Sequence, residues 1–120
     1  MLSRCGRLND TNSVNDSKEA SMFLVRDIMY CKPGKARAMV DKFVALSAIT
    51  QKMGMGAMRV MTDVSAERYW TVVSEMEVPS LDALSDRATK AMGNPEFQAA
   101  MQGYHDLVDN GRREIYTIEK

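Results

Sequence analysis

The 120-residue chain contains only two cysteines, Cys5 and Cys31, and one histidine, His105. Two cysteines cannot form a disulfide framework and lack zinc-ligand spacing, so we expect reduced thiols in the cytoplasm and no metal site. Cys31 is expected to be a structural thiol, because no activating histidine lies near it in sequence. Any imidazole chemistry must use His105, which makes it the candidate catalytic residue.

Neither sign of charge is in excess, because sixteen Lys and Arg balance sixteen Asp and Glu. A basic excess is what holds a phosphate backbone, so we expect no nucleic-acid partner. Long apolar runs are also missing: none approaches the roughly 18 residues of a membrane helix, and the first residues lack the apolar stretch of a secretory signal. We therefore expect no membrane partner.

The first 21 residues are rich in Asn, Asp and Ser and show no apolar periodicity. We predict a flexible tail over 1–21, with Met22 as an alternative start of translation. Residues 22–120 are expected to form one domain. A chain that is 45% hydrophobic can build one core, and 120 residues leave no room for a second domain.

Apolar periodicity predicts the order strand, helix, strand, strand, helix, strand. The second helix begins at the cap Ser80 and restarts at Asn94-Pro95-Glu96. This order is that of an α+β, ferredoxin-like βαββαβ domain, with a four-stranded antiparallel sheet and two helices on one face. The predicted strands are 22–31, 57–62, 68–78 and 112–119, the helices are 35–53 and a stretch from 81 through 108, and Asn110-Gly111 is the last turn.

Both faces of the predicted strands are apolar. In the first strand Leu24, Ile28 and Tyr30 alternate with Val25 and Met29. Two helices cover only one face of a four-stranded sheet, so the other face would meet water unless a second sheet covers it. At about 25 cal/mol per Å² of apolar surface, covering such a face favours association. We therefore predict a sheet-to-sheet homodimer.

Three segments resemble the dimeric α/β-barrel superfamily: Lys32-Pro33-Gly34-Lys35, Asn94-Pro95-Glu96-Phe97 and Arg113-Glu114-Ile115-Tyr116. The resemblance covers residues 22–120. It implies that two sheets form a barrel with helices outside, and that a ligand pocket lies between the sheet and helices of each subunit. The superfamily includes cofactor-free monooxygenases, haem-degrading enzymes, isomerases and uncharacterised proteins, so the activity stays open. We expect no cofactor.

Aromatic and charged side chains within the predicted strands are the candidate ligand-binding residues. Tyr69 and Trp70 lie on opposite faces of the third strand, where each ring either lines a cavity or packs in the core. Buried strand charges must be paired, so they indicate an ion-pair network or a ligand site. The charged strand residues are Arg26, Asp27, Arg59, Glu75, Glu77 and Glu114, and the predicted ligand-binding set is Arg26, Tyr30, Tyr69, Trp70 and Glu75.

Eleven methionines are many for a chain of this length, and Met53, Met55, Met58 and Met61 cluster. Thioethers can hold Cu(I), but this cluster crosses a helix end, a turn and a strand, so adaptable core packing is the favoured interpretation. The functional hypothesis is a homodimer that binds a small hydrophobic or aromatic metabolite, with cofactor-free monooxygenase-like or isomerase-like chemistry. The alternative is a non-catalytic structural or ligand-carrying dimer.

Overall fold

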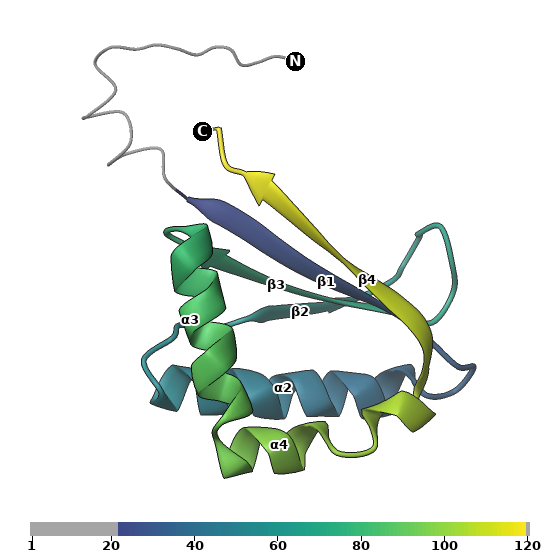
Figure 1. The fold of residues 1–120 in the computed structure, drawn as a ribbon. Helices are drawn as coiled ribbons and strands as arrows, with labels where there is room; N and C mark the ends of the chain where they lie inside the picture. The colour runs from purple at the N-terminus through teal and green to yellow at the C-terminus, as the bar shows by residue number, and fades with distance from the viewer. Residues whose placement is uncertain (1–21, 120) are drawn as a thin grey trace.

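The computed structural model describes residues 22–119 (Figure 1). The tail predicted over 1–21, with Cys5, lies outside the described residues. The elements in chain order are β1 (Phe23–Cys31), α2 (Ala36–Lys52), β2 (Arg59–Thr62), β3 (Thr71–Val78), α3 (Leu81–Met92), α4 (Pro95–Met101), a 3-10 helix η1 (Tyr104–Asp106) and β4 (Val108–Thr117).

The four strands form one antiparallel sheet in the order β2-β3-β1-β4. This arrangement confirms the predicted ferredoxin-like α+β architecture. In the pairing register Asp27 lies beside Ser74 of β3 and Arg113 of β4, so these three side chains share the sheet face that carries the helices. Figure 1 shows the helices gathered on one side of the sheet, with no helix of the described residues on the other.

The core lies between α2 and the sheet. Met39, Val40, Phe43 and Leu46 recur at helical spacing on α2 and pack against Val72 of β3. The turn that precedes α2 contains Gly34 at φ 81°, a left-handed conformation that glycine adopts without strain. The apolar stripe predicted for this helix is therefore the stripe that builds the core.

The second predicted helix is divided into α3 and α4, and each part has the expected cap. Ser80 Oγ accepts a hydrogen bond from the Ala83 N–H at 3.0 Å, and Asn94 caps α4 with Pro95 in its first turn. α3 stands steeply across α2, whereas α4 runs alongside α2 (Figure 1). No helix among residues 22–119 has the length and apolar character needed to cross a membrane.

The boundaries after α4 differ from the prediction. The helix ends at Met101 instead of continuing through Val108, because Gly103 takes φ 84° and a 3-10 turn follows. β4 then begins at Val108, and Asn110-Gly111 lies inside the strand, paired with Tyr30 and Met29, instead of forming a turn. Gly111 is required at this position, since a Cβ there would lie 2.9 Å from the main-chain carbonyl oxygen of Ile28, which cannot move without disrupting the strand.

The third strand is also shorter than predicted. It begins at Thr71, so Tyr69 and Trp70 belong to the preceding loop and do not occupy opposite faces of a strand. Trp70 has φ 62°, a backbone conformation that residues other than glycine rarely adopt. Hydrogen bonds hold it there: the Cys31 N–H donates to the Trp70 carbonyl oxygen at 2.9 Å, and the Thr71 N–H donates to Asp63 Oδ1 at 2.9 Å.

Candidate functional site

A cavity of about 280 Å³ lies between the sheet and the helices, and α3 forms one of its walls. We refer to it as the sheet–helix cavity. Its lining is mainly apolar, with Phe43 and Leu46 of α2, Leu84 and Ala91 of α3, and Phe97 of α4. The charged lining residues are Asp27, Arg87 and Arg113. The cavity thus occupies the position that the superfamily resemblance predicts for a ligand pocket.

The cavity exists because α3 does not pack closely on the sheet. The predicted inward stripe of α3 is Leu81, Leu84, Ala88 and Met92, yet Leu81 is 52% exposed and Met92 is 65% exposed. Ala91 is the only buried residue of the helix. Small side chains face the gap from both sides, Ala88 and Ala91 from α3 and Ser74 from β3, so the space between them is not filled.

Asp27 and Arg113 form an ion pair on the cavity wall. Arg113 Nε donates to Asp27 Oδ1 at 2.7 Å, and Nη2 donates to Oδ2 at 3.1 Å, which is the two-point geometry that guanidinium and carboxylate groups favour. The hydrogen bonds that Arg113 donates to Asp27 raise the pKa of Arg113 above its ordinary value. Arg113 therefore keeps its positive charge at the cavity.

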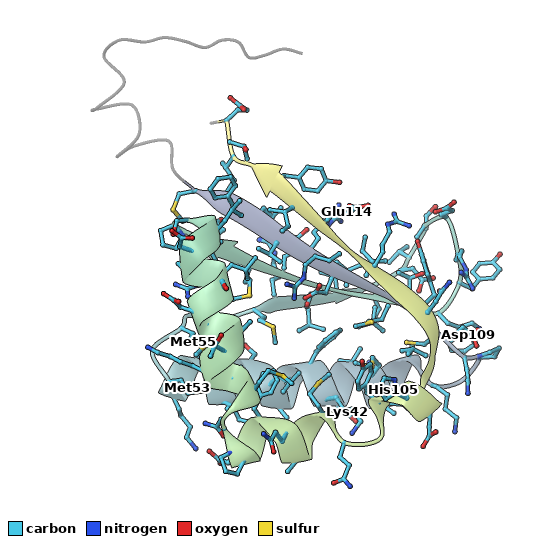
Figure 2. All side chains as sticks on the ribbon, in the orientation of Figure 1. Lys42, Met53, Met55, His105, Asp109 and Glu114 are labelled. Carbon is cyan, nitrogen blue, oxygen red and sulfur yellow. The ribbon has the colours of Figure 1, made fainter. Side chains whose placement is uncertain are left out.

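Six of the eleven methionines line the sheet–helix cavity: Met29, Met55, Met58, Met76, Met92 and Met101. Thioether side chains are unbranched and adapt their shape to a neighbour. The methionines that cluster in the sequence between residues 53 and 61 do not form one group in the structure. Met55 and Met58 line the cavity, whereas Met53 Sδ accepts a hydrogen bond from Asn94 Nδ2 at 3.3 Å. Figure 2 shows Met53 and Met55 where the end of α2 approaches α3.

The sheet face without helices, which we call the open sheet face, carries an ion-pair network. Glu75 is buried between two arginines: Arg59 Nη2 donates to its Oε1 at 2.7 Å, and Arg26 Nε lies 3.0 Å from its Oε2 without a well-directed hydrogen bond. The sequence prediction of paired strand charges is confirmed here. Two residues of the predicted ligand-binding set, Arg26 and Glu75, are thus partners of each other.

A second cluster on the open sheet face centres on Glu114 of β4. Tyr116 Oη donates to Glu114 Oε1 at 2.6 Å, and Arg112 Nε donates to Oε2 at 2.9 Å. These two hydrogen bonds, of which the one from Tyr116 has the larger effect, hold the pKa of the Glu114 carboxyl below its usual range. The hydrogen bond between Tyr116 and Glu114 also raises the pKa of the Tyr116 hydroxyl.

Tyr30, also predicted to bind ligand, lies on the open sheet face beneath two arginines. The Arg68 guanidinium carbon is 4.3 Å from the ring centroid, and Arg112 donates a hydrogen bond to the Tyr30 hydroxyl. Tyr30 is only 7% exposed and its neighbour on this face, Ile28, is 6% exposed. The expectation of a wholly apolar second face is therefore wrong in part, because the chain's own arginines cover some of it.

Tyr69 and Trp70 lie together in the loop before β3, away from the sheet–helix cavity. Both line a shallow groove with Ala36, Arg37 and Val40 of the α2 region. Tyr69 is 85% exposed, so it is not a core residue. Tyr69 and Trp70 thus lie near each other, and neither lines the sheet–helix cavity.

His105 lies on η1 and not on a long second helix as predicted. Its ring is exposed and lies against the Tyr104 ring, with the ring centroids 4.0 Å apart. Figure 2 shows His105 at the turn between α4 and β4, whereas Glu114 lies farther along β4. His105 does not line the sheet–helix cavity, so its catalytic assignment stays a prediction.

Solved structures share this arrangement of strands and helices. A NIPSNAP family protein from Agrobacterium tumefaciens matches with a TM-score of 0.70 and 16% identity, over 82% of this chain and 87% of that one. An antibiotic biosynthesis monooxygenase-like protein from Chloroflexus aurantiacus matches with a TM-score of 0.63 and 14% identity, over 83% and 95% of the two chains. This chain has a ferredoxin-like fold.

A third match is a protein from Bacteroides fragilis described as dimeric, of unknown function and with a ferredoxin-like fold. Its TM-score is 0.63 at 15% identity, over 82% of this chain and 97% of that one. No protein-family model matches the sequence, and no curated protein matches it either. At these identities the likeness shows the fold alone. The ferredoxin-like architecture that the resemblance implies for one subunit is therefore confirmed.

The charged wall of the sheet–helix cavity is the feature that the sequence interpretation missed. The sequence pattern identifies Asp27 as a strand charge, whereas Arg113 belongs to a segment that indicates the fold and Arg87 carries no distinguishing signal. The signal that could have found the pair is strand alternation, since Asp27 has the same parity as Val25 and Met29, and Arg113 the same as Ile115. Only the β1–β4 register brings the two residues together.

Proposed function

We propose that this protein is a homodimer that binds a small apolar or aromatic metabolite in the sheet–helix cavity. The observation that carries the proposal is the cavity itself, which is apolar over most of its wall and has a charged pair, Asp27 and Arg113, at one position. Ligand pockets combine such walls with a few polar groups that fix orientation. At about 280 Å³ the cavity is near the lower limit for ligand pockets, which favours a compact molecule of one or two rings.

Cofactor-free monooxygenase-like or isomerase-like chemistry is the second candidate, and Asp27 is the observation that favours it. Proton transfer from a bound substrate needs a base on the cavity wall, and Asp27 is the carboxylate among the described lining residues. A non-catalytic carrier would need the same cavity without proton transfer. The two differ in whether a bound compound is converted, and in whether Asp27→Asn stops conversion while leaving binding intact.

The homodimer would use the open sheet face, as the superfamily architecture implies. Three arginines and three glutamates point from the strands to this face, so a two-fold axis can bring opposite charges together without an excess of either sign. The six are Arg26, Arg59, Arg112, Glu75, Glu77 and Glu114. One solved structure of the same fold is described as dimeric. The cytoplasm remains the expected compartment.

Binding of a neutral aromatic probe tests the cavity proposal. We expect naphthalene-2-carboxamide to raise the unfolding midpoint of the protein and to give a saturable calorimetric titration. Ala88→Trp places an indole on the cavity wall and should abolish binding. Ala99→Trp is the matched control, because Ala99 is an exposed alanine of α4 that does not line the cavity. Absence of binding of both this amide and the corresponding acid, naphthalene-2-carboxylate, to the unmodified protein would contradict the proposal, and so would unchanged binding to Ala88→Trp.

A further inference from the structure

The wall of the sheet–helix cavity holds more positive than negative charge. Its charged lining residues are two arginines, Arg87 and Arg113, and one aspartate, Asp27. Asp27 uses both carboxylate oxygens on Arg113, so it leaves Arg87 without a carboxylate partner among residues 22–119. The pairing therefore leaves one net positive charge beside an apolar cavity.

Both guanidinium groups keep hydrogen-bond donors available. A guanidinium has five N–H donors, and Asp27 takes two of those of Arg113. Arg87 Nη1 donates to the main-chain carbonyl oxygen of Glu77 at 3.4 Å, a long contact that uses one donor. An acceptor that enters the cavity can thus replace water at either arginine without breaking the Asp27 pair.

The charge count selects among possible acceptors. Guanidinium groups bind carboxylate and phosphate in similar geometry. A phosphate monoester carries nearly two negative charges at neutral pH. The cavity wall has a surplus of only one positive charge, so the second negative charge of the phosphate would be repelled by the Asp27 carboxylate. A carboxylate carries one negative charge and balances that surplus. The apolar, methionine-rich remainder of the wall would then hold the body of the molecule.

We propose that the ligand of the sheet–helix cavity is a small amphiphilic carboxylate, whose acid group binds Arg113 and Arg87 and whose apolar or aromatic body contacts the methionine-lined wall. This inference rests on the proposed function and specifies its ligand class. In this arrangement Asp27 is a positioning residue, because it fixes the Arg113 guanidinium in one orientation through two hydrogen bonds.

A pair of probes of equal shape tests the inference. Naphthalene-2-carboxylate and naphthalene-2-carboxamide share one ring system and differ in charge. Calorimetric titration at neutral pH and low salt should show the acid binding about tenfold or more tightly than the amide, as charge-assisted hydrogen bonds predict. The preference should shrink as salt is added, because the acid group lies at a partly exposed arginine.

Variants locate the preference on the cavity wall. Arg113→Gln should reduce the affinity for the acid about tenfold and leave the affinity for the amide nearly unchanged. Because this change leaves Asp27 unpaired, the double variant Asp27→Asn with Arg113→Gln removes the pair together and should give the same result. Arg112→Gln is the matched control, since Arg112 is the adjacent arginine, points to the open sheet face and binds Glu114. It should keep the preference.

The outcomes separate the inference from the proposed function. Equal affinities for acid and amide would overturn the carboxylate inference while the cavity proposal stands. Binding of neither probe would overturn both. Loss of the preference in Arg112→Gln but not in the Arg113 variants would place the acid on the open sheet face and overturn the inference.

Discussion

At the scale of single residues, burial decides the chemistry of Cys31. The side chain is 4% exposed at the end of β1 and belongs to the core cluster with Met39 and Val72. Burial raises the pKa of the thiol, and the nearby Asp109 carboxylate raises it further. The thiolate is the reactive form, so the raised pKa lowers the reactivity of Cys31 at neutral pH. This environment favours the structural interpretation over a nucleophile.

We predict that alkylation of Cys31 requires unfolding. In a Cys5→Ser background, iodoacetamide should label the folded protein at least about tenfold more slowly than the urea-unfolded chain at the same pH, followed by mass spectrometry. The raised pKa means that the folded state favours the neutral Cys31 thiol. The contribution of this thiol to the stability of the folded protein is therefore complete at pH values below the ordinary thiol pKa, and it is lost as the pH rises through the raised pKa. Equal labelling rates would identify Cys31 as accessible and contradict the burial argument.

At the scale of elements, short polar contacts determine where helices begin. Asn94 Oδ1 accepts hydrogen bonds from the Glu96 N–H at 2.8 Å and the Phe97 N–H at 3.1 Å, which satisfies two free donors at the start of α4. α4 has only seven residues and depends on these contacts and on α2. Lys42 of α2 donates to the Ala100 and Gln102 carbonyl oxygens at the other end of α4.

We predict that Asn94→Ala lowers the free energy of unfolding by about 1 kcal/mol, measured by urea denaturation. Asn94→Asp is the control, because it keeps the acceptor oxygen and places a negative charge at the positive end of the helix. It should remain close to the unmodified protein. An Asn94→Asp variant as unstable as Asn94→Ala would show that the hydrogen bond from Asn94 Nδ2 to Met53 Sδ matters more than the cap.

The same scale explains which elements the sequence could predict. β1, α2 and the start of α3 follow from local patterns, namely apolar periodicity, a proline-glycine breaker and a serine cap. The end of α4 and the start of β4 depend on tertiary pairing, since the bulge at Tyr30 and Cys31 and the partners of β1 decide where β4 begins. Asn110-Gly111 is a turn signal locally, but strand pairing overrides it.

The candidate site was predictable to a smaller degree than the fold. Its position between sheet and helices follows from the architecture, and its strand charges were visible in the sequence. The size of the cavity was not, because it depends on how far α3 lies from the sheet, and no local pattern encodes that distance. The aromatic and β-branched run at 69–73 predicts a strand, but tertiary hydrogen bonds hold Tyr69 and Trp70 in a loop.

At the scale of the whole molecule, the open sheet face has a different character from the one the sequence predicts. Arginines cover Tyr30, Ile28 is buried, and Glu75 and Glu114 are each paired with an arginine. Exposed ion pairs contribute little to the stability of a single chain, but they can select a partner surface of matching charge. A second copy of the face meets this condition, so we expect charge pattern as well as apolar area to determine the homodimer.

We predict that Tyr116→Glu converts the proposed homodimer to a monomer. Tyr116 is 47% exposed on the open sheet face, and a glutamate there adds a negative charge beside Glu114 and removes a ring from the interface. Ile115 gives a matched control, because this residue directly before Tyr116 in β4 is 43% exposed but points to the helix side of the sheet. Sedimentation velocity at micromolar concentration should show a dimer for the unmodified protein and for Ile115→Glu, and a monomer for Tyr116→Glu. If Ile115→Glu dissociated the dimer and Tyr116→Glu did not, the interface would lie on the helix side of the sheet. A barrel formed by two open sheet faces would then be excluded.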